Sequence, residues 1–355
     1  MDAHLTAIVI PCLNEEHHLI STCGSLGFGA DRSPPDRALL VLVDNGSEDR
    51  TIEVAESIQQ SCPGGCVIIT TESERGYVPP RRSGNRLAIA TACDRGIGRD
   101  NLLIIQADAD TLYEDGYLNE IRLAAERHGP GVMIDAVIEY DKDFIVRRAD
   151  YVSLCNEVDE QFGLILPDQS QDVIVDDKAC AYWASDYELW GGHQREYTSF
   201  GDEIHAESAR LYIRGLTYGA SRYLCESAIA RHSNRRTVAD PAFAFATAGF
   251  PREMRFRCRW EDVYDGVNDI AEFAKVVNRP SIQLAIRCRR AHTEGLFIML
   301  TAHVSRALNP KGADTWTGSL GSLPMRNVEI ARGTPGVLIE DVLTEVDKFA
   351  FQLEN

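Results

Sequence analysis

The stretch Leu102-Leu103-Ile104-Ile105-Gln106-Ala107-Asp108-Ala109-Asp110-Thr111 decides the fold, because a short apolar run ends there in two carboxylates one residue apart. The run has the length of a buried strand in a parallel sheet, whose two faces are both covered. Acids at its end would stand at the edge where open α/β sheets bind ligands. Asp108 and Asp110 are hard oxygen ligands that suit Mg²⁺ or Mn²⁺. Taken alone, the pair could also be an acidic turn exposed to solvent.

The sequence around this stretch alternates strand-like and helix-like patterns over the first 135 residues. Strands are predicted at 6–10, 39–43, 67–70, 102–105 and 131–137, and helices at 15–26, 51–60, 82–94 and 115–128. Such alternation predicts an α/β fold with a parallel sheet and helices on both faces. The segment 138–236 is less regular and rich in aromatic residues, which is typical of a binding surface. Further helices are predicted at 260–277, 281–308 and 337–353.

The composition is that of a globular enzyme, with 44% hydrophobic and 25% charged residues in a chain of 355. The net charge of −18, from 54 acids and 36 bases, argues against nucleic acid as a partner. No run approaches the roughly 20 apolar residues of a membrane span, and the first residues do not resemble a secretory signal. The ten cysteines lack zinc-like paired spacing. These observations predict a reduced, cytoplasmic protein without a membrane span.

Four polar segments follow successive strands or open helices, so a parallel sheet would bring them to one edge. They are Pro11-Cys12-Leu13-Asn14-Glu15, Asp44-Asn45-Gly46-Ser47-Glu48-Asp49-Arg50-Thr51, Arg81-Arg82-Ser83-Gly84 and the Asp108/Asp110 pair. Gly46 permits a tight turn, and Ser47 can cap a helix. In this order and spacing, the segments resemble the motifs of family 2 glycosyltransferases with the GT-A fold. The specific resemblance covers about residues 5–125, and a looser one continues to about 236.

The resemblance implies a GT-A, Rossmann-like α/β fold, with a mostly parallel sheet flanked by helices and a helical C-terminal extension. It divides the chain into a glycosyltransferase domain at 1–236 and the extension at 237–355. Within the domain, 1–135 would form the nucleotide-sugar half and 136–236 the acceptor half. The implied activity is transfer of a sugar from a UDP- or GDP-linked donor to a hydroxyl of a small-molecule or glycan acceptor. The implied cofactor is Mn²⁺ or Mg²⁺.

The resemblance also implies roles for residues of the donor half. The nucleotide-binding residues would be Pro11, Asn14, Glu15, Asp44, Asn45, Arg81 and Asp108. Asp44 would accept a hydrogen bond from the base, although a turn-stabilising acid is the alternative. Arg81 would complement the charge of the diphosphate. Asp108 would approach the ribose or the sugar, and Asp110, with Asp108, would hold the metal.

The acceptor side departs from the family pattern. An acidic pair that supplies the catalytic base usually follows a Gly-Gly turn, and here Gly191-Gly192 precedes Asp202-Glu203. The usual spacing from that pair to the next arginine is not reproduced at Arg210, so either acid could be the base, with Asp202 preferred. Asp202 would equally suit a helix N-cap.

A basic segment completes the candidate site. Ala230-Arg231-His232-Ser233-Asn234-Arg235-Arg236 resembles the serine-arginine element that follows the last core strand of the family. His232 would supply a nitrogen ligand to the metal, and Arg235 or Arg236 would clamp the diphosphate. A solvated basic loop is the alternative for this segment.

Three other functions compete with an inverting transferase. A retaining GT-A enzyme of the kind that makes sugar-glycerate compounds would need no placed base. A non-catalytic nucleotide-sugar-binding scaffold would keep the donor site without turnover. A nucleotidyltransferase normally carries a Gly-rich loop after its first strand, and Pro11 to Glu16 contains no glycine.

Overall fold

The computed structural model describes residues 4–30, 32–162, 173–197, 201, 203–247, 267 and 269–278. The chain forms two compact units. The first comprises residues 1–139, 175–197 and 203–232, and the second comprises residues 140–174, 198–202 and 233–355. The division predicted from the sequence at residue 236 stays a prediction.

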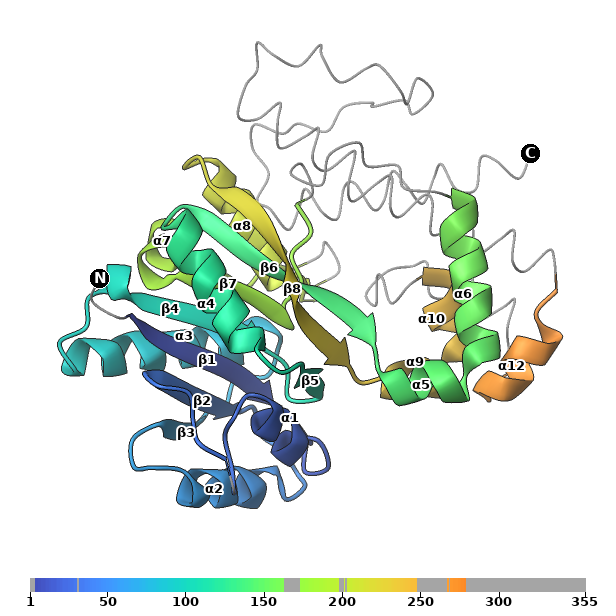
Figure 1. The fold of residues 1–355 in the computed structure, drawn as a ribbon, viewed down its shortest axis with the longest axis horizontal. Helices are drawn as coiled ribbons and strands as arrows, with labels where there is room; N and C mark the ends of the chain where they lie inside the picture. Colours follow the sequence, from blue (N-terminus) through green and yellow to red (C-terminus); the bar gives the residue numbers. More distant parts are fainter. Residues whose placement is uncertain are drawn as a thin grey trace, which may run out of the picture. The chain divides into compact units, whose positions relative to one another are not determined.

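The first unit is built on a sheet of eight strands in the order β3-β2-β1-β4-β7-β6-β8-β5 (Figure 1). Its strands are β1 (Leu5–Cys12), β2 (Ala38–Asp44), β3 (Val67–Thr71), β4 (Leu102–Ala107), β5 (Thr111–Tyr113), β6 (Val132–Tyr140), β7 (Ala179–Trp183) and β8 (Ser221–His232). Strand β1 is parallel to both β2 and β4, and β2 is parallel to β3. Strand β7 is antiparallel to β4 and β6, and β5 is antiparallel to β8. The predicted α/β fold is confirmed, with a sheet whose parallel half is β3-β2-β1-β4.

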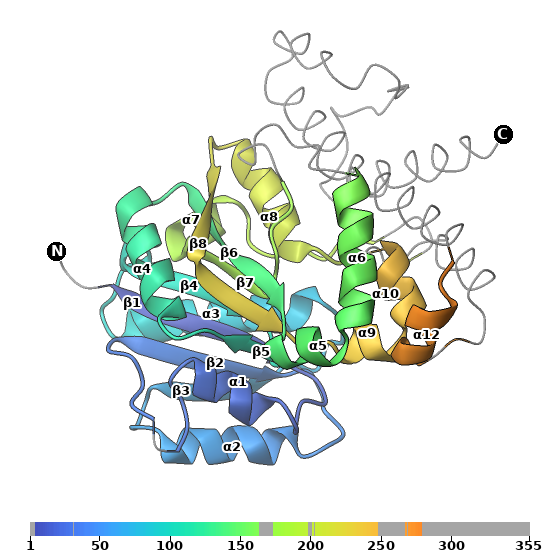
Figure 2. The ribbon, with the colours of Figure 1, turned by 45° about the vertical axis from the view of Figure 1, so that its right-hand side comes forward.

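Helices cover both faces of this sheet, as Figures 1 and 2 show. The helices of the first unit are α1 (Leu19–Ser25), α2 (Thr51–Ser61), α3 (Val78–Asp94), α4 (Tyr117–His128), α7 (Ala184–Leu189) and α8 (Glu207–Leu216), with a 3₁₀ turn at Arg99–Asn101. Ile8, Leu40 and Ile105 share one buried cluster with residues of α1, α2 and α4. The intervening side chains of the same strands, such as Val9 and Val43, face α3. This alternation is why the strands read as continuous apolar runs.

A glycine lets α3 lie close to the sheet. A Cβ at Gly84 would overlap Cγ1 of Val9 and come within 2.9 Å of Cγ2 of Val43. The helix therefore crosses β1 and β2 at a distance that no other residue at position 84 would allow. This close approach also fixes the first turn of α3, which carries Arg81, against the sheet.

The first helix begins later than the sequence predicted, at Leu19 rather than Glu15. The chain before it is held in a loop by side chains of the neighbouring loop. The Glu15 amide donates to Thr51 Oγ1 at 2.7 Å, and the Glu16 amide donates to Asp49 Oδ2 at 3.2 Å. Asn14 adopts a left-handed conformation with φ 57°. These tertiary contacts outweigh the helical periodicity of the segment.

The described part of the second unit is helical and packs around aromatic side chains. Its helices are α5 (Lys142–Arg147), α6 (Ala149–Phe162), α9 (Arg235–Ala239), α10 (Pro241–Thr247) and α12 (Ile270–Val276). The Tyr151 ring contacts the rings of Phe144, Phe245 and Phe273, and its hydroxyl donates to the Pro241 carbonyl at 2.9 Å. Helix α12 lies inside the helix predicted at 260–277. The helices predicted at 281–308 and 337–353 lie outside the described residues.

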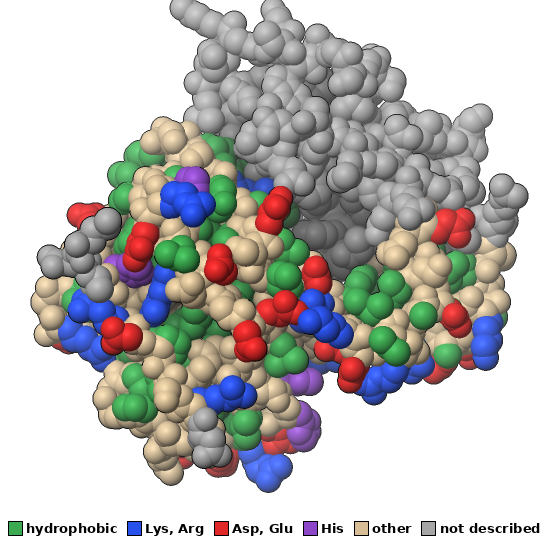
Figure 3. Space-filling model, viewed as in Figure 1, with side chains coloured by type: hydrophobic (Ala, Val, Ile, Leu, Met, Phe, Trp, Pro, Cys, Tyr) green, Lys and Arg blue, Asp and Glu red, His purple; other side chains and the backbone are tan. Residues whose placement is uncertain are grey.

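The surface of the described residues agrees with the composition. On the face that Figure 3 shows, acidic and basic side chains are interspersed, and no extended basic patch is visible among the coloured residues. None of the described helices is both long and apolar enough to span a membrane.

Candidate active site

Three polar loops meet at one edge of the parallel half of the sheet. They follow β1, β2 and β4, which are parallel neighbours, so their carboxyl ends lie side by side. The loops are also tied together. Asn14 accepts the Glu48 amide at 2.8 Å, and its own amide donates to Ser47 Oγ at 3.0 Å. The Thr22 hydroxyl donates to the Ala109 carbonyl at 2.8 Å and so links α1 to the D-x-D segment.

The polar residues after β1 and β2 shape these loops. The buried Asp44 carboxylate accepts the Gly46 amide at 3.0 Å and the Ser47 amide at 3.2 Å, in a turn that Gly46 closes with φ 77°. The Asn45 side chain donates to the carbonyls of Glu72 and Glu74, both at 2.8 Å. Asp44 therefore stabilises the turn, which was the alternative to the predicted contact with the base. A carboxylate has further lone pairs, so the two roles are compatible.

Pro11 and Glu15 occupy the β1 side of the same edge. Pro11 is half-buried in β1 and pairs with Val43 of β2. Glu15 is buried and follows Asn14, whose backbone is left-handed, in the chain. The structure thus brings the predicted residues of the first two loops together around the ends of β1 and β2.

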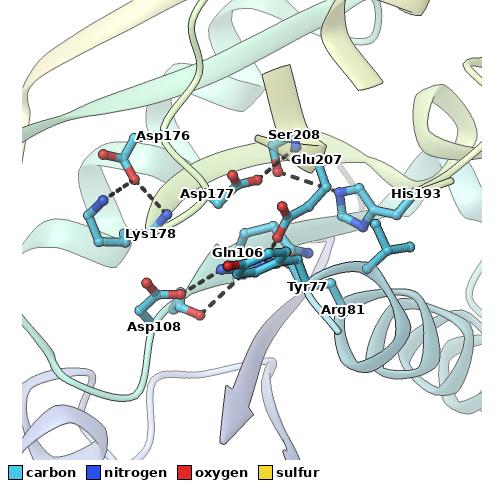
Figure 4. A network of polar contacts seen from close by, with 12 residues as sticks. Tyr77, Arg81, Gln106, Asp108, Asp176, Asp177, Lys178, His193, Glu207 and Ser208 are labelled. Atoms are coloured by element: carbon cyan, nitrogen blue, oxygen red, sulfur yellow. Dashed lines mark hydrogen bonds and ion pairs between the residues drawn. The ribbon is translucent and has the colours of Figure 1, made fainter. Parts of the chain in front are cut away.

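Arg81 lies in the first turn of α3 and is buried in a network of protein acceptors (Figure 4). Its Nη2 contacts Asp108 Oδ1 at 2.5 Å, and its Nε contacts Glu207 Oε1 at 2.7 Å. Its Nη1 donates to Gln106 Oε1 at 3.2 Å and to the Ala107 carbonyl at 3.4 Å. Burial acts to lower the pKa of Arg81, but the two carboxylates outweigh it and raise the pKa. Arg81 therefore holds the first D-x-D acid in place.

Lys178 stands beside Asp108 on the neighbouring strand, a residue that the sequence interpretation did not include. In the antiparallel pairing of β4 with β7, Ala107 faces Ala179, so the next positions on each strand are Asp108 and Lys178. The Tyr113 hydroxyl bridges them, because it accepts the Asp108 amide at 3.0 Å and donates to the Lys178 carbonyl at 2.8 Å. The Lys178 ammonium pairs with Asp176 Oδ1 at 2.8 Å.

Asp177 and Glu207 form a second acidic group behind Arg81. The Ser208 amide donates to Asp177 Oδ1 at 2.7 Å, and Glu207 is nearly inaccessible to solvent. Burial and the neighbouring Glu207 carboxylate raise the pKa of Asp177 to about 7, although Arg81 acts in the opposite direction. A carboxyl that holds a proton near neutral pH lowers the negative charge that the network must carry.

His193 contacts the same network at Ser208 of α8 and at Asn85 of α3. Its Nε2 lies 3.4 Å from Ser208 Oγ, and its Nδ1 lies 3.5 Å from Asn85 Nδ2. Burial and the surrounding arginines lower the pKa of His193 well below its ordinary value, so the ring is neutral at pH 7. Because Ser208 and His193 are both buried, this pair positions α8 and is not accessible to a substrate.

Asp110 and His232 lie at the short antiparallel ladder between β5 and β8. Thr111 pairs with His232, so Asp110 is one position along the chain from this pair. A carboxylate oxygen and an imidazole nitrogen are a donor set that suits Mn²⁺. Within the described ranges, no three His, Cys, Asp or Glu side chains form a ready-made metal cage. The predicted role of Asp110 and His232 as ligands of a divalent cation stays a prediction.

The predicted acidic pair lies partly outside the described residues, because Asp202 is not among them. Glu203 closes the start of α3: its carboxylate accepts the Tyr77 amide at 3.3 Å and the Val78 amide at 3.2 Å, and it pairs with Arg195 at 3.1 Å. A Cβ at Gly76 would overlap the Glu203 carboxylate. Glu203 thus caps a helix N-terminus, where a negative charge is stabilising.

Arg235 and Arg236 belong to α9 of the second unit. Arg235 is half-buried, and its amide donates to Ser233 Oγ at 3.3 Å, whereas Arg236 is exposed. Their predicted contact with a diphosphate stays a prediction.

The site residues that the sequence interpretation missed are the triplet Asp176-Asp177-Lys178 and the pair Glu207-Ser208. One signal for the triplet was available, since three charged residues directly precede the apolar run 179–183. No signal showed that this run is antiparallel to β4. No signal identified Glu207 as a partner of Arg81, which lies 126 positions earlier.

Comparisons with known proteins give one family and several structures of low similarity. A mannosyltransferase from Pyrobaculum calidifontis, in complex with GDP-Man and Mn²⁺, has 16% identity and a TM-score of 0.46, with 97% of this chain and 87% of that chain covered. GalNAc-T7 with UDP, GalNAc and Mn²⁺ has 13% identity and a TM-score of 0.44, with 65% of this chain covered. This chain spans only 44% of that GalNAc-T7 chain. S. aureus TarS 1–349 with UDP-GlcNAc has 12% identity and a TM-score of 0.44, with 88% and 89% covered.

No curated protein sequence matches the chain. The sequence model of one family, Glycosyl transferase family 2, matches residues 7–185, which is half of the chain and includes the loops after β1, β2 and β4. This match confirms the resemblance seen in the motifs. The chain therefore belongs to glycosyl transferase family 2 and is a glycosyltransferase.

Proposed function

We propose that this glycosyltransferase transfers a sugar from a UDP- or GDP-linked donor to an acceptor hydroxyl, with a divalent cation and with inversion at the anomeric carbon. The observation that carries the proposal is the placement of the D-x-D segment. Its two acids stand beside the loops of Asp44 and Glu15, and Arg81 fixes Asp108 from inside the protein. That edge is where parallel α/β sheets bind nucleotides.

The donor would bind with its base over the loop of Asp44 and its diphosphate toward the D-x-D segment. Asp110 and His232 would hold the cation, with Asp108 beside them. A divalent cation bound there supplies Lewis-acid stabilisation of the departing diphosphate. Asp108 would then contact the ribose or the sugar through the oxygen atom that Arg81 does not hold.

The proposed transfer requires one general base, which removes the proton of the acceptor hydroxyl. The acceptor oxygen attacks the anomeric carbon, the bond from that carbon to the diphosphate oxygen breaks, and its electron pair leaves with the diphosphate. A carboxylate takes the acceptor proton. We assign this base to Asp202. The oxygens of Glu203 are engaged by the start of α3 and by Arg195, so Glu203 would hold the chain directly after Asp202 in place.

A binding screen with one substitution tests the donor site. Calorimetry of the wild-type protein with UDP, GDP and their sugars should show binding that Mn²⁺ strengthens. Asp110→Ala should weaken the Mn²⁺-dependent part at least about tenfold, because the cation loses a charged ligand. Asp115→Ala is the matched control, since Asp115 is an exposed acid just after β5. Absence of binding by any nucleoside diphosphate in the wild-type protein would contradict the proposed donor site.

The stereochemistry is tested separately. Asp202→Asn should abolish transfer while nucleotide binding is kept, and the product's anomeric configuration, read by NMR, should be inverted relative to the donor. Near-full activity in an Asp202→Asn/Glu203→Gln double variant, with retained configuration, would favour the retaining enzyme instead.

A further inference from the structure

Arg81 and Lys178, the two cationic side chains near Asp108, differ in how many of their N–H donors are already engaged by the protein. All three nitrogens of the Arg81 guanidinium donate to protein acceptors, and the side chain is 5% exposed. A guanidinium engaged in this way has little capacity for a diphosphate. The Lys178 side chain is 29% exposed, and Asp176 is its ion-pair partner among the residues that the structure describes. An ammonium carries three N–H donors, so Lys178 can bind a further anion.

The backbone fixes Lys178 next to the D-x-D segment. The pairing of Ala107 with Ala179 places Lys178 across from Asp108 on the adjacent strand, and Figure 4 shows both at the same side of the network. The Tyr113 hydroxyl joins the backbone of the two residues. Tyr113 is buried, so this bridge is rigid. Lys178 therefore directly precedes the start of β7, at the edge of the sheet where the D-x-D segment follows β4.

Neighbouring carboxylates keep the Lys178 side chain protonated by raising its pKa. Burial acts to lower the pKa of Lys178, but the carboxylates of Asp176, Asp108 and Asp177 outweigh burial and raise it. The ammonium is consequently protonated at every pH at which the protein would work. It is a permanent cation placed where a nucleotide sugar would bring its diphosphate.

We propose that the Lys178 ammonium binds the diphosphate of the donor directly, so that part of the affinity for nucleoside diphosphates does not require a divalent cation. This inference rests on the proposed donor site and adds a binding residue to it. Asp110 and His232 would serve the cation, and Lys178 would serve the phosphate oxygens from the β7 side. Lys178, just before β7, would thus take the role that the family resemblance implied for Arg81 in helix α3.

The test measures binding in EDTA, without any metal. Wild-type protein is titrated by calorimetry with uridine, UMP and UDP, and with guanosine, GMP and GDP. For the base that binds, the diphosphate should bind at least about tenfold more tightly than the nucleoside, as expected for a charge-assisted contact. Lys178→Met should remove most of that difference while nucleoside affinity stays within about twofold. Lys178→Arg should keep most of it, and Lys142→Met, at an exposed lysine of α5, should change nothing.

The outcomes separate this inference from the proposed function. If the wild-type protein binds no nucleoside diphosphate with or without Mn²⁺, the donor site and the inference both fall. If it binds diphosphates only with Mn²⁺, or if Lys178→Met binds UDP and GDP in EDTA as the wild-type protein does, the inference alone is overturned. Melting temperatures test whether each variant is folded. If Lys178→Met does not fold, the loss of the diphosphate preference in Lys178→Arg, or its absence in the wild-type protein, would still overturn the inference.

Discussion

Replacing Arg81 by methionine should destabilise the protein strongly, because Arg81 is a buried clamp. The change would leave Glu207, whose side chain is 5% exposed, without its 2.7 Å partner, and Asp108 without its 2.5 Å partner. Breaking a buried ion pair by removing one partner costs about 3–5 kcal/mol. Asp108 contributes less of this than Glu207, because its side chain is 29% exposed and water screens it. The free energy of unfolding is measured by urea titration followed by circular dichroism.

A double-mutant cycle distinguishes this clamp from a surface contact. Glu207→Gln in the Arg81→Met background removes the stranded charge, so the double variant should be more stable than the sum of the single effects predicts by about 2 kcal/mol. Arg82→Met is the matched control, because Arg82 pairs at 3.3 Å with the half-exposed Glu74 and should cost less than about 1 kcal/mol. Additive effects, or an Arg81→Met variant as stable as the control, would refute the buried clamp.

Two further predictions concern packing and pH. Gly84→Ala should lower the free energy of unfolding by about 1–3 kcal/mol in the same urea assay, because its Cβ would overlap Val9 and crowd Val43; stability equal to wild type would show that α3 can move away. As pH rises from 4 to 7, the unfolded chain loses the Asp177 proton near pH 3.8 while the folded chain keeps it to about pH 7. This residue's contribution to stability is therefore complete below pH 3.8 and is lost as pH rises through 7, by up to about 1.4 kcal/mol per pH unit. Asp177→Asn should lack that part of the decline, and an unchanged pH profile would contradict the raised pKa.

The parallel half of the sheet could be predicted because its strands are buried on both faces. All seven residues of β2 and all six of β4 are buried, and such runs stand out in the sequence. In the antiparallel half, only β6 was predicted, at 131–137. Strand β7 is a short run of small and aromatic residues, and β8 mixes exposed and buried positions. The pairing of β7 with β4 is set by contacts between segments far apart in the chain, which periodicity does not record.

The candidate site shows the same division between local and distant information. Asp44, Asp108 and Asp110 could be proposed from the sequence because each lies at, or within five residues of, the end of a predicted strand. Their surroundings could not, since Glu207 is 126 positions from Arg81, and Lys178 is 65 positions from Tyr113. A register shift of one residue between β4 and β7 would turn Lys178 to the other face. Its place beside Asp108 is therefore a property of the sheet and not of any motif.

The two acids of the D-x-D segment have different surroundings because the first directly follows β4 and the second directly precedes β5. Asp108 directly follows β4, where Arg81 and Lys178 approach it from α3 and β7. Asp110 directly precedes β5, whose partner strand ends at His232. Arg81 neutralises the first acid from within the protein, which lowers the attraction of Asp108 for a cation. In the proposed donor site, Asp108 would therefore be a fixed residue beside the Lys178 ammonium, and the cation would bind at Asp110.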